Sequence, residues 1–168
     1  MAVIGTHQIG YFKPEDSKID DLKFKCKFNF SDINFIHEKR FGHDKWVLNL
    51  GQILNKILSE MQNEPSTNNF IINIKKIRVV SFKKGLFQWS SHLINIGILY
   101  EILDYQKNII DKGEVIGQGS GSGKELGKAT YVPVYGNLKF DKAIELAIYR
   151  CYENCLRQLC EKFKKIKQ

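Results

Sequence analysis

The stretch "SHLINIGILYEILDYQKNIIDKGEVIGQG", from Ser91 to Gly119, decides the predicted fold. Its first half alternates apolar and polar side chains, which is the pattern of a half-buried strand. The residues that share the apolar face are Ile94, Ile96, Ile98, Tyr100 and Ile102. The polar "YQKN" predicts a turn, and a weaker, more polar strand follows it. The stretch therefore predicts a β-hairpin whose second strand lies at the edge of a sheet.

Two more strands are predicted before this hairpin. "DDLKFKCKFNFSD", which begins at Asp20, alternates throughout. Its apolar face carries Leu22, Phe24, Cys26, Phe28 and Phe30. "FIINIKKIRVVSF", which begins at Phe70, changes phase between Ile74 and Ile77. Because a slip of one residue reverses the facing of a strand, this change predicts a β-bulge near Lys75–Lys76.

Two segments show the apolar spacing of amphipathic helices. Residues 45–62 form the first, with Asp44 as N-cap and Pro65 just beyond its end. Residues 139–166 form a longer helix whose final lysines complement the helix dipole. The predicted order is β-α-β-β-β-α. The fold class is α+β: a single antiparallel or mixed sheet of about four strands, with the two helices packed on one face.

At 168 residues and 43% hydrophobic, the chain suits one domain with a substantial core. Residues 1–20 are interpreted as a flexible N-terminal leader, and residues 21–168 as a single α+β domain. No run of about 18 apolar residues is present, so no transmembrane helix is predicted. The first twenty residues also lack the charged and apolar sections of a signal peptide.

Residues 110–136 hold seven of the thirteen glycines and raise the question of a phosphate-binding loop. A Walker loop needs a glycine five positions before the Gly-Lys pair and Ser or Thr after it. Counting from Gly123 and Lys124 gives Gln118 and Glu125, so both requirements fail. The next helix is expected some fifteen residues later, beyond Pro133. The run is therefore interpreted as a flexible connector, and no cofactor is expected.

The chain has a net charge of +8, with 22 lysines and 4 arginines. A basic balance favours phosphate or acidic-membrane partners. Sequence-specific nucleic-acid readers, however, depend on the planar fork of arginine. Because the lysines are spread from Lys13 to Lys167, a solvated surface is favoured, with a functional basic patch as the alternative.

Side chains for catalysis or metal binding are sparse. The four histidines, His7, His37, His43 and His92, share no metal-ligand spacing, so no metal site and no catalytic residue are predicted. Cys26, Cys151, Cys155 and Cys160 fall on or near predicted buried faces, where a free thiol behaves as a small hydrophobe. These thiols favour mildly reducing conditions or an envelope without strong disulfide chemistry. A bridge from Cys26 to the last helix stays open.

The succession "WVLNLGQILNKILSEM", "NFIINIKKIRVVSF", "HLINIGILYEILDYQKNIIDKGEVIGQGSG" and "FDKAIELAIYRCYENCLRQL" resembles the YajG-type bacterial lipoproteins over residues 44 to 160. The resemblance lies in the order, length and hydrophobic phase of the elements. Similar small α+β domains occur in other envelope lipoproteins and in the N-terminal domain of TolB-like proteins. This chain lacks the lipidated N-terminal Cys of the family, which fits a signal and anchor removed from it.

The resemblance implies a non-catalytic lipoprotein domain that acts as a binding or assembly module in the bacterial periplasm. It also implies a precursor anchored to the outer membrane by a lipid that is absent from this chain. The alternative is a cytosolic nucleic-acid-binding protein similar to single-strand annealing proteins, and free cysteines also suit a cytoplasmic location.

We expect protein partners or self-association, through exposed apolar or strand-edge surface. The weak strand 109–117 is one candidate, as an open edge that accepts a partner strand. The second candidate is a set of side chains in the segments "GLFQW" and "YVPVYG", where large rings often anchor interfaces. The expected partner-binding residues are Leu86, Phe87, Trp89, Tyr131 and Tyr135. The alternative is that these rings cap the core.

Overall fold

The computed structural model describes residues 5–61, 70–85, 91–129 and 138–167. These residues form two sheets, three α-helices and a short 3₁₀ helix, η1 (Ile19–Asp21). The strands are β1 (Gly5–Ile9), β2 (Lys27–Phe30), β3 (His37–Phe41), β4 (Asp44–Leu48), β5 (Ile71–Lys83), β6 (Ser91–Leu103) and β7 (Ile109–Ser122). The α-helices are α1 (Leu50–Glu60), α2 (Gly123–Ala129) and α3 (Leu138–Lys167).

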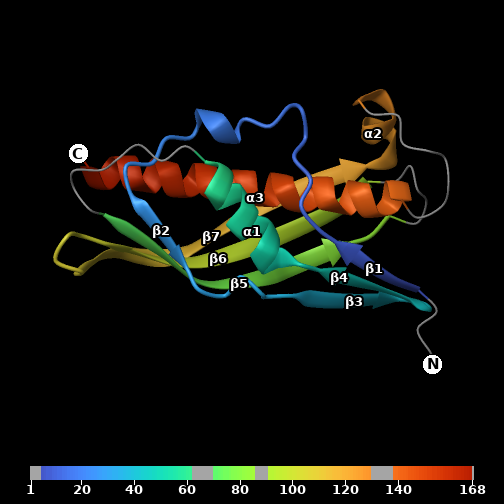
Figure 1. Cartoon of the computed structure of the whole chain (residues 1–168), viewed down its shortest axis with the longest axis horizontal. Helices are drawn as coiled ribbons and strands as arrows, with labels where there is room; N and C mark the ends of the chain where they lie inside the picture. The colour runs from blue at the N-terminus through green and yellow to red at the C-terminus, as the bar shows by residue number, and fades with distance from the viewer. Residues whose placement is uncertain (1–4, 62–69, 86–90, 130–137, 168) are drawn as a thin grey trace.

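The fold is mixed α+β, but the prediction of a single four-stranded sheet is inexact. A four-stranded sheet has the order β2-β5-β6-β7, and a second sheet has the order β1-β4-β3. β2 pairs in parallel with β5 and β1 with β4, whereas the other neighbours are antiparallel. In Figure 1 the three long strands run beneath α3, and the small sheet lies at one end.

The second sheet corrects two predictions. Residues 5–9, within the predicted leader, form β1, because Ile9 is fully buried and the strand pairs with β4 along its length. Residues 44–48 form β4 and not the first turn of a helix, so α1 begins only at Leu50. Three consecutive residues of β4 (Trp46, Val47 and Leu48) are buried, which hides the alternation of a strand. Gly42, at φ +62°, makes the turn between β3 and β4.

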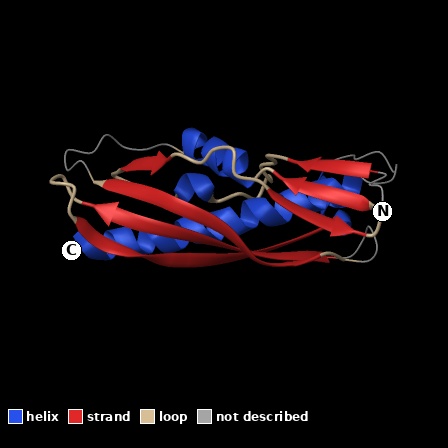
Figure 2. Cartoon of the chain, turned by 90° about the horizontal axis from the view of Figure 1, so that it is seen from below, coloured by secondary structure: helices blue, strands red, loops and turns tan. Residues whose placement is uncertain are grey.

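The predicted hairpin and its core face are confirmed. Ile94, Ile96 and Ile98 are fully buried on the face of the four-stranded sheet that α3 covers. The bulge predicted in β5 is also present, since the register shifts between Ile74 and Lys76. Both long helices contribute to the same core, as predicted, and Tyr152 of α3 donates a hydrogen bond of 2.8 Å to the Leu50 carbonyl of α1. Figure 2 shows the opposite face of this sheet without a helix over it.

The glycine-rich run is not the flexible connector that was predicted. β7 continues to Ser122, and Gly117, Gly119 and Gly121 face α3. A Cβ atom built on each would lie 2.1, 2.1 and 2.2 Å, respectively, from a carbonyl oxygen of α3. The glycines are therefore needed because the backbones of helix and strand approach closely. The next helix, α2, begins directly at Gly123, where the prediction expected no helix before Pro133.

Among the described residues, no helix is both long and apolar enough to span a membrane. The four cysteines are buried and none of them forms a disulfide, so the bridge from Cys26 to the last helix is absent. Burial raises the pKa of the Cys151 thiol and raises that of Cys155 to about 12. These thiols therefore pack as small apolar groups between α3 and the sheet.

Candidate functional site

The five partner-binding residues expected from the sequence, Leu86, Phe87, Trp89, Tyr131 and Tyr135, lie outside the described residues. The other expected surface, the weak strand after the turn, is described in full as β7. β7 is the last strand of its sheet, so one side of its backbone faces no other strand of that sheet. This side is the first candidate binding surface.

Side chains of α3 cap the second half of this edge. The carbonyls of Ser120, Gln118 and Ile116 are alternate groups along β7. They accept hydrogen bonds from Arg150 (2.9 Å), Asn154 (3.4 Å) and Gln158 (2.7 Å), respectively. The donors are four residues apart and form one row along the helix. Because β6 occupies the other side of β7, these carbonyls are those that point away from the sheet.

The first half of the edge is open. The next alternate residues along β7 are Glu114 and Lys112, and no described side chain donates to their carbonyls. An open hollow of about 500 Å³ adjoins this half and is lined by residues that include Leu99, Lys112 and Glu114. Ile109 and Ile110 are 52% and 39% exposed. The open half of the β7 edge, residues 109–115, therefore combines free backbone groups with exposed apolar side chains.

The sheet face opposite α3, called here the open face, continues from this edge. Gly97 of the central strand lets Arg78 of β5 reach across to Glu114 of β7, with nitrogen–oxygen distances of 2.6 and 3.0 Å. The bond from Arg78 lowers the pKa of the Glu114 carboxyl. Half-buried Leu93 and Leu99 add apolar surface. None of the described β5, β6 and β7 positions on this face carries an aromatic ring, whereas proteins that bind single strands stack bases on such rings.

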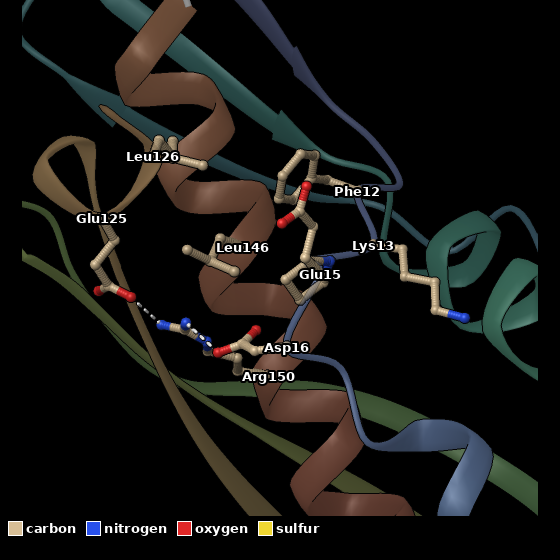
Figure 3. A pocket seen from close by; sticks show the side chains of 9 residues that line it. Phe12, Lys13, Glu15, Asp16, Glu125, Leu126, Leu146 and Arg150 are labelled. Carbon is tan, nitrogen blue, oxygen red and sulfur yellow. Dashed lines mark hydrogen bonds and ion pairs between the residues drawn. The ribbon is translucent and has the colours of Figure 1, made fainter. Parts of the chain in front are cut away.

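A cavity of about 420 Å³ lies between the segment 12–16, α2 and α3. Figure 3 shows Phe12, Leu126 and Leu146 on its apolar side. Arg150 lies opposite and pairs with Glu125 (2.7 Å) and with Asp16 (3.4 Å). Since two carboxylates already balance this guanidinium, the cavity suits an apolar group better than an anion.

A cluster around His7 was not foreseen from the sequence. The His7 ring stacks on Trp46 at 4.5 Å, and its Nδ1 lies 3.1 Å from a carboxylate oxygen of Asp141. The other oxygen of Asp141 accepts the indole N–H of Trp46, also at 3.1 Å. This geometry ties β1 and β4 to the start of α3 and uses both oxygens of the carboxylate. Sequence spacing gave no signal, because His7 and Asp141 are 134 residues apart.

The buried side chain of His92 makes the stability of the fold depend on pH. It is 0% exposed, and its Nδ1 accepts the Gly85 N–H at 3.0 Å. Burial, and then the charge of Lys84, lower its pKa from 6.5 to about 4. The folded protein therefore holds His92 neutral, and protonation would break the bond to Gly85.

We expect stability to fall as the pH drops from 6.5 towards 4. The unfolded chain takes up a proton on His92 near pH 6.5, and the folded chain does so only near pH 4. The stability that His92 contributes is thus complete above pH 6.5 and is lost below it, by roughly 2–4 kcal/mol in total. Urea unfolding at pH 7.5, 5.5 and 4.5 measures this loss. In His92→Asn the loss between these pH values should shrink by that amount, and an equal loss in both proteins would contradict the assignment.

The described residues contain no group of three His, Cys, Asp or Glu side chains that could hold a metal ion. That most of the lysines lie on a solvated surface stays a prediction.

No family model and no curated protein matches the chain. Among solved structures, it is similar to a candidate lipoprotein from Caulobacter crescentus CB15, with 9% identity, a TM-score of 0.47, and 84% of this chain and 88% of that chain covered. It is also similar to a minor lipoprotein from Acinetobacter baumannii, with 11% identity, a TM-score of 0.45, and coverage of 87% and 92%. At these values neither likeness establishes what this chain binds or where it acts.

Proposed function

We propose that this chain is a non-catalytic binding or assembly module of the bacterial cell envelope, carried by a lipid-anchored precursor on the periplasmic side of the outer membrane. The observation that carries the binding role is the open half of the β7 edge, residues 109–115, which adjoins the open face. Free backbone groups at a strand edge accept a partner strand, and the exposed isoleucines add apolar contact.

The envelope location has separate support. The structure has the order α1, β5, β6, β7, α2 and α3, and the resemblance to YajG-type lipoproteins rests on these elements without α2. That this chain is of the YajG type is also a proposal. The open face argues against the nucleic-acid alternative. Its arginine, Arg78, already forms an ion pair with Glu114 and is therefore not available for a phosphate.

Photo-cross-linking in cells tests the proposal. A photoreactive amino acid is placed at Leu99 or Ile116 in the full-length precursor, and at Lys162 as a matched control on the exposed side of α3. We expect protein adducts from Leu99 and Ile116 and none from Lys162. We also expect the precursor to incorporate labelled palmitate and to fractionate with the outer membrane. A soluble cytosolic protein without lipid would overturn the envelope role. Adducts to nucleic acid, or equal adducts from Lys162, would overturn the binding role.

A further inference from the structure

We propose that the partner of the open half of the β7 edge is a second copy of this chain, paired antiparallel with its own β7 about Gly113. This inference rests on the proposed function, because it names the partner of the same edge. Antiparallel pairing of a strand with the same strand of a second copy has two-fold symmetry, and two-fold symmetry is the commonest among homo-oligomers.

The sequence of the open half is self-complementary about Gly113. Antiparallel pairing with Gly113 on the two-fold axis places Lys112 of each copy directly opposite Glu114 of the other. Both residues belong to the open face, whereas Ile110 is passed over at a shift in the register between β6 and β7, so the regular pairing ends before it. Opposite charges directly across two strands stabilise their pairing, and like charges destabilise it. One register therefore matches both charge pairs.

The backbone of β7 fits the same register. Ile116, Gln118 and Ser120 direct their carbonyls away from β6, so Lys112 and Glu114, in the same alternate set, do so too. In an antiparallel pair, residues that face each other in this way exchange both of their backbone hydrogen bonds. The hydrogen bond from Arg78 keeps the Glu114 carboxylate on the open face, which is the face on which Lys112 of the second copy would lie.

The capped half of the edge limits how far the pairing extends. The bonds from Gln158, Asn154 and Arg150 occupy the outward carbonyls of Ile116, Gln118 and Ser120, so the backbone groups left for the second copy are those of Lys112 and Glu114. The contact is therefore short and its dimer weak, with a dissociation constant on the order of 10–100 µM. Two such copies would join their sheets and double the area of the open face.

Sedimentation equilibrium of the purified chain, from micromolar to millimolar concentration, tests the dimer. Lys112→Pro removes an outward N–H that no strand of its own sheet uses, and should abolish association. Gln118→Pro makes the same change on the same edge outside the paired half, and should leave the dissociation constant within about two-fold of wild type. Circular dichroism confirms that both variants stay folded.

A charge exchange tests the register. Lys112→Glu places two glutamates opposite each other, and Glu114→Lys places two lysines opposite each other, so each variant alone should dimerise about ten-fold more weakly. An equimolar mixture should recover association, because every pair then joins opposite charges. A chain that stays monomeric to millimolar concentration overturns the inference, as does a dimer that Lys112→Pro leaves intact or a mixture without recovery. These results come from the purified chain alone, so failure of the envelope role would not change them.

Discussion

Replacing Gly119 by valine is expected to lower the free energy of unfolding by about 3–5 kcal/mol. A Cβ atom at this position would lie 2.1 Å from the Ala147 carbonyl oxygen and 2.6 Å from the Cys151 backbone nitrogen. Both atoms belong to the backbone of α3, so no side-chain rotation relieves the collision, and α3 must move off the sheet. Because small domains have only about 5–15 kcal/mol of stability, the variant should be close to unfolding at ambient temperature.

Gly113→Ala is the matched control for this experiment. Gly113 lies on the same strand and the same face, but its Cβ would be no closer than 3.5 Å to any atom of Tyr100, which is ordinary contact. Alanine there should change stability by less than about 0.5 kcal/mol, since the site is open. Chemical denaturation of the two variants gives the difference. Equal stabilities would show that α3 does not lie as close to the glycines as the structure places it.

The second large effect is expected for Ile96→Asp. Ile96 is 0% exposed in the centre of the sheet and faces α3. A carboxylate there has no partner and no water, so the loss should reach about 4–5 kcal/mol, or the carboxyl should stay protonated with a strongly raised pKa. Asn95→Asp introduces the same group one residue earlier, on the open face, and should cost less than about 1 kcal/mol. Cooperative unfolding of Ile96→Asp at wild-type stability would contradict the orientation of β6.

β5, β6 and α3 were predictable because each buries one continuous face. The strand predicted from Asp20 is wrong up to Cys26, since residues 19–21 form η1 and β2 begins only at Lys27. Alternation marked Ile94 to Ile102 as a strand, and the change of phase after Ile74 located the bulge. The small sheet was missed since β1 has only two inward side chains, His7 and Ile9, which is too short to show a period. Residues 46–48 are buried on both sides, so their spacing matched a helix equally well.

The edge site was predictable in part. The sequence correctly indicated a polar edge strand, but the glycines were interpreted as flexible because glycine permits any backbone angle. Their spacing of two residues, at Gly117, Gly119 and Gly121, was the signal that they share one face of a strand. The row Arg150, Asn154 and Gln158 also shows helical spacing, yet its contact with β7 depends on how closely the glycines let α3 approach. That distance is a property of the tertiary structure.

β7 is an edge strand with its inner backbone groups bound to β6 and its outer groups free or capped by α3. Amide hydrogen exchange measured by NMR in dilute solution tests it most directly. We expect slow exchange at Gly117, Gly119 and Gly121, whose N–H groups point to β6, and faster exchange at Gln118 and Ser120, whose N–H groups point away. Uniformly fast exchange across residues 117–121 would contradict it, because it would show a flexible connector in place of the strand.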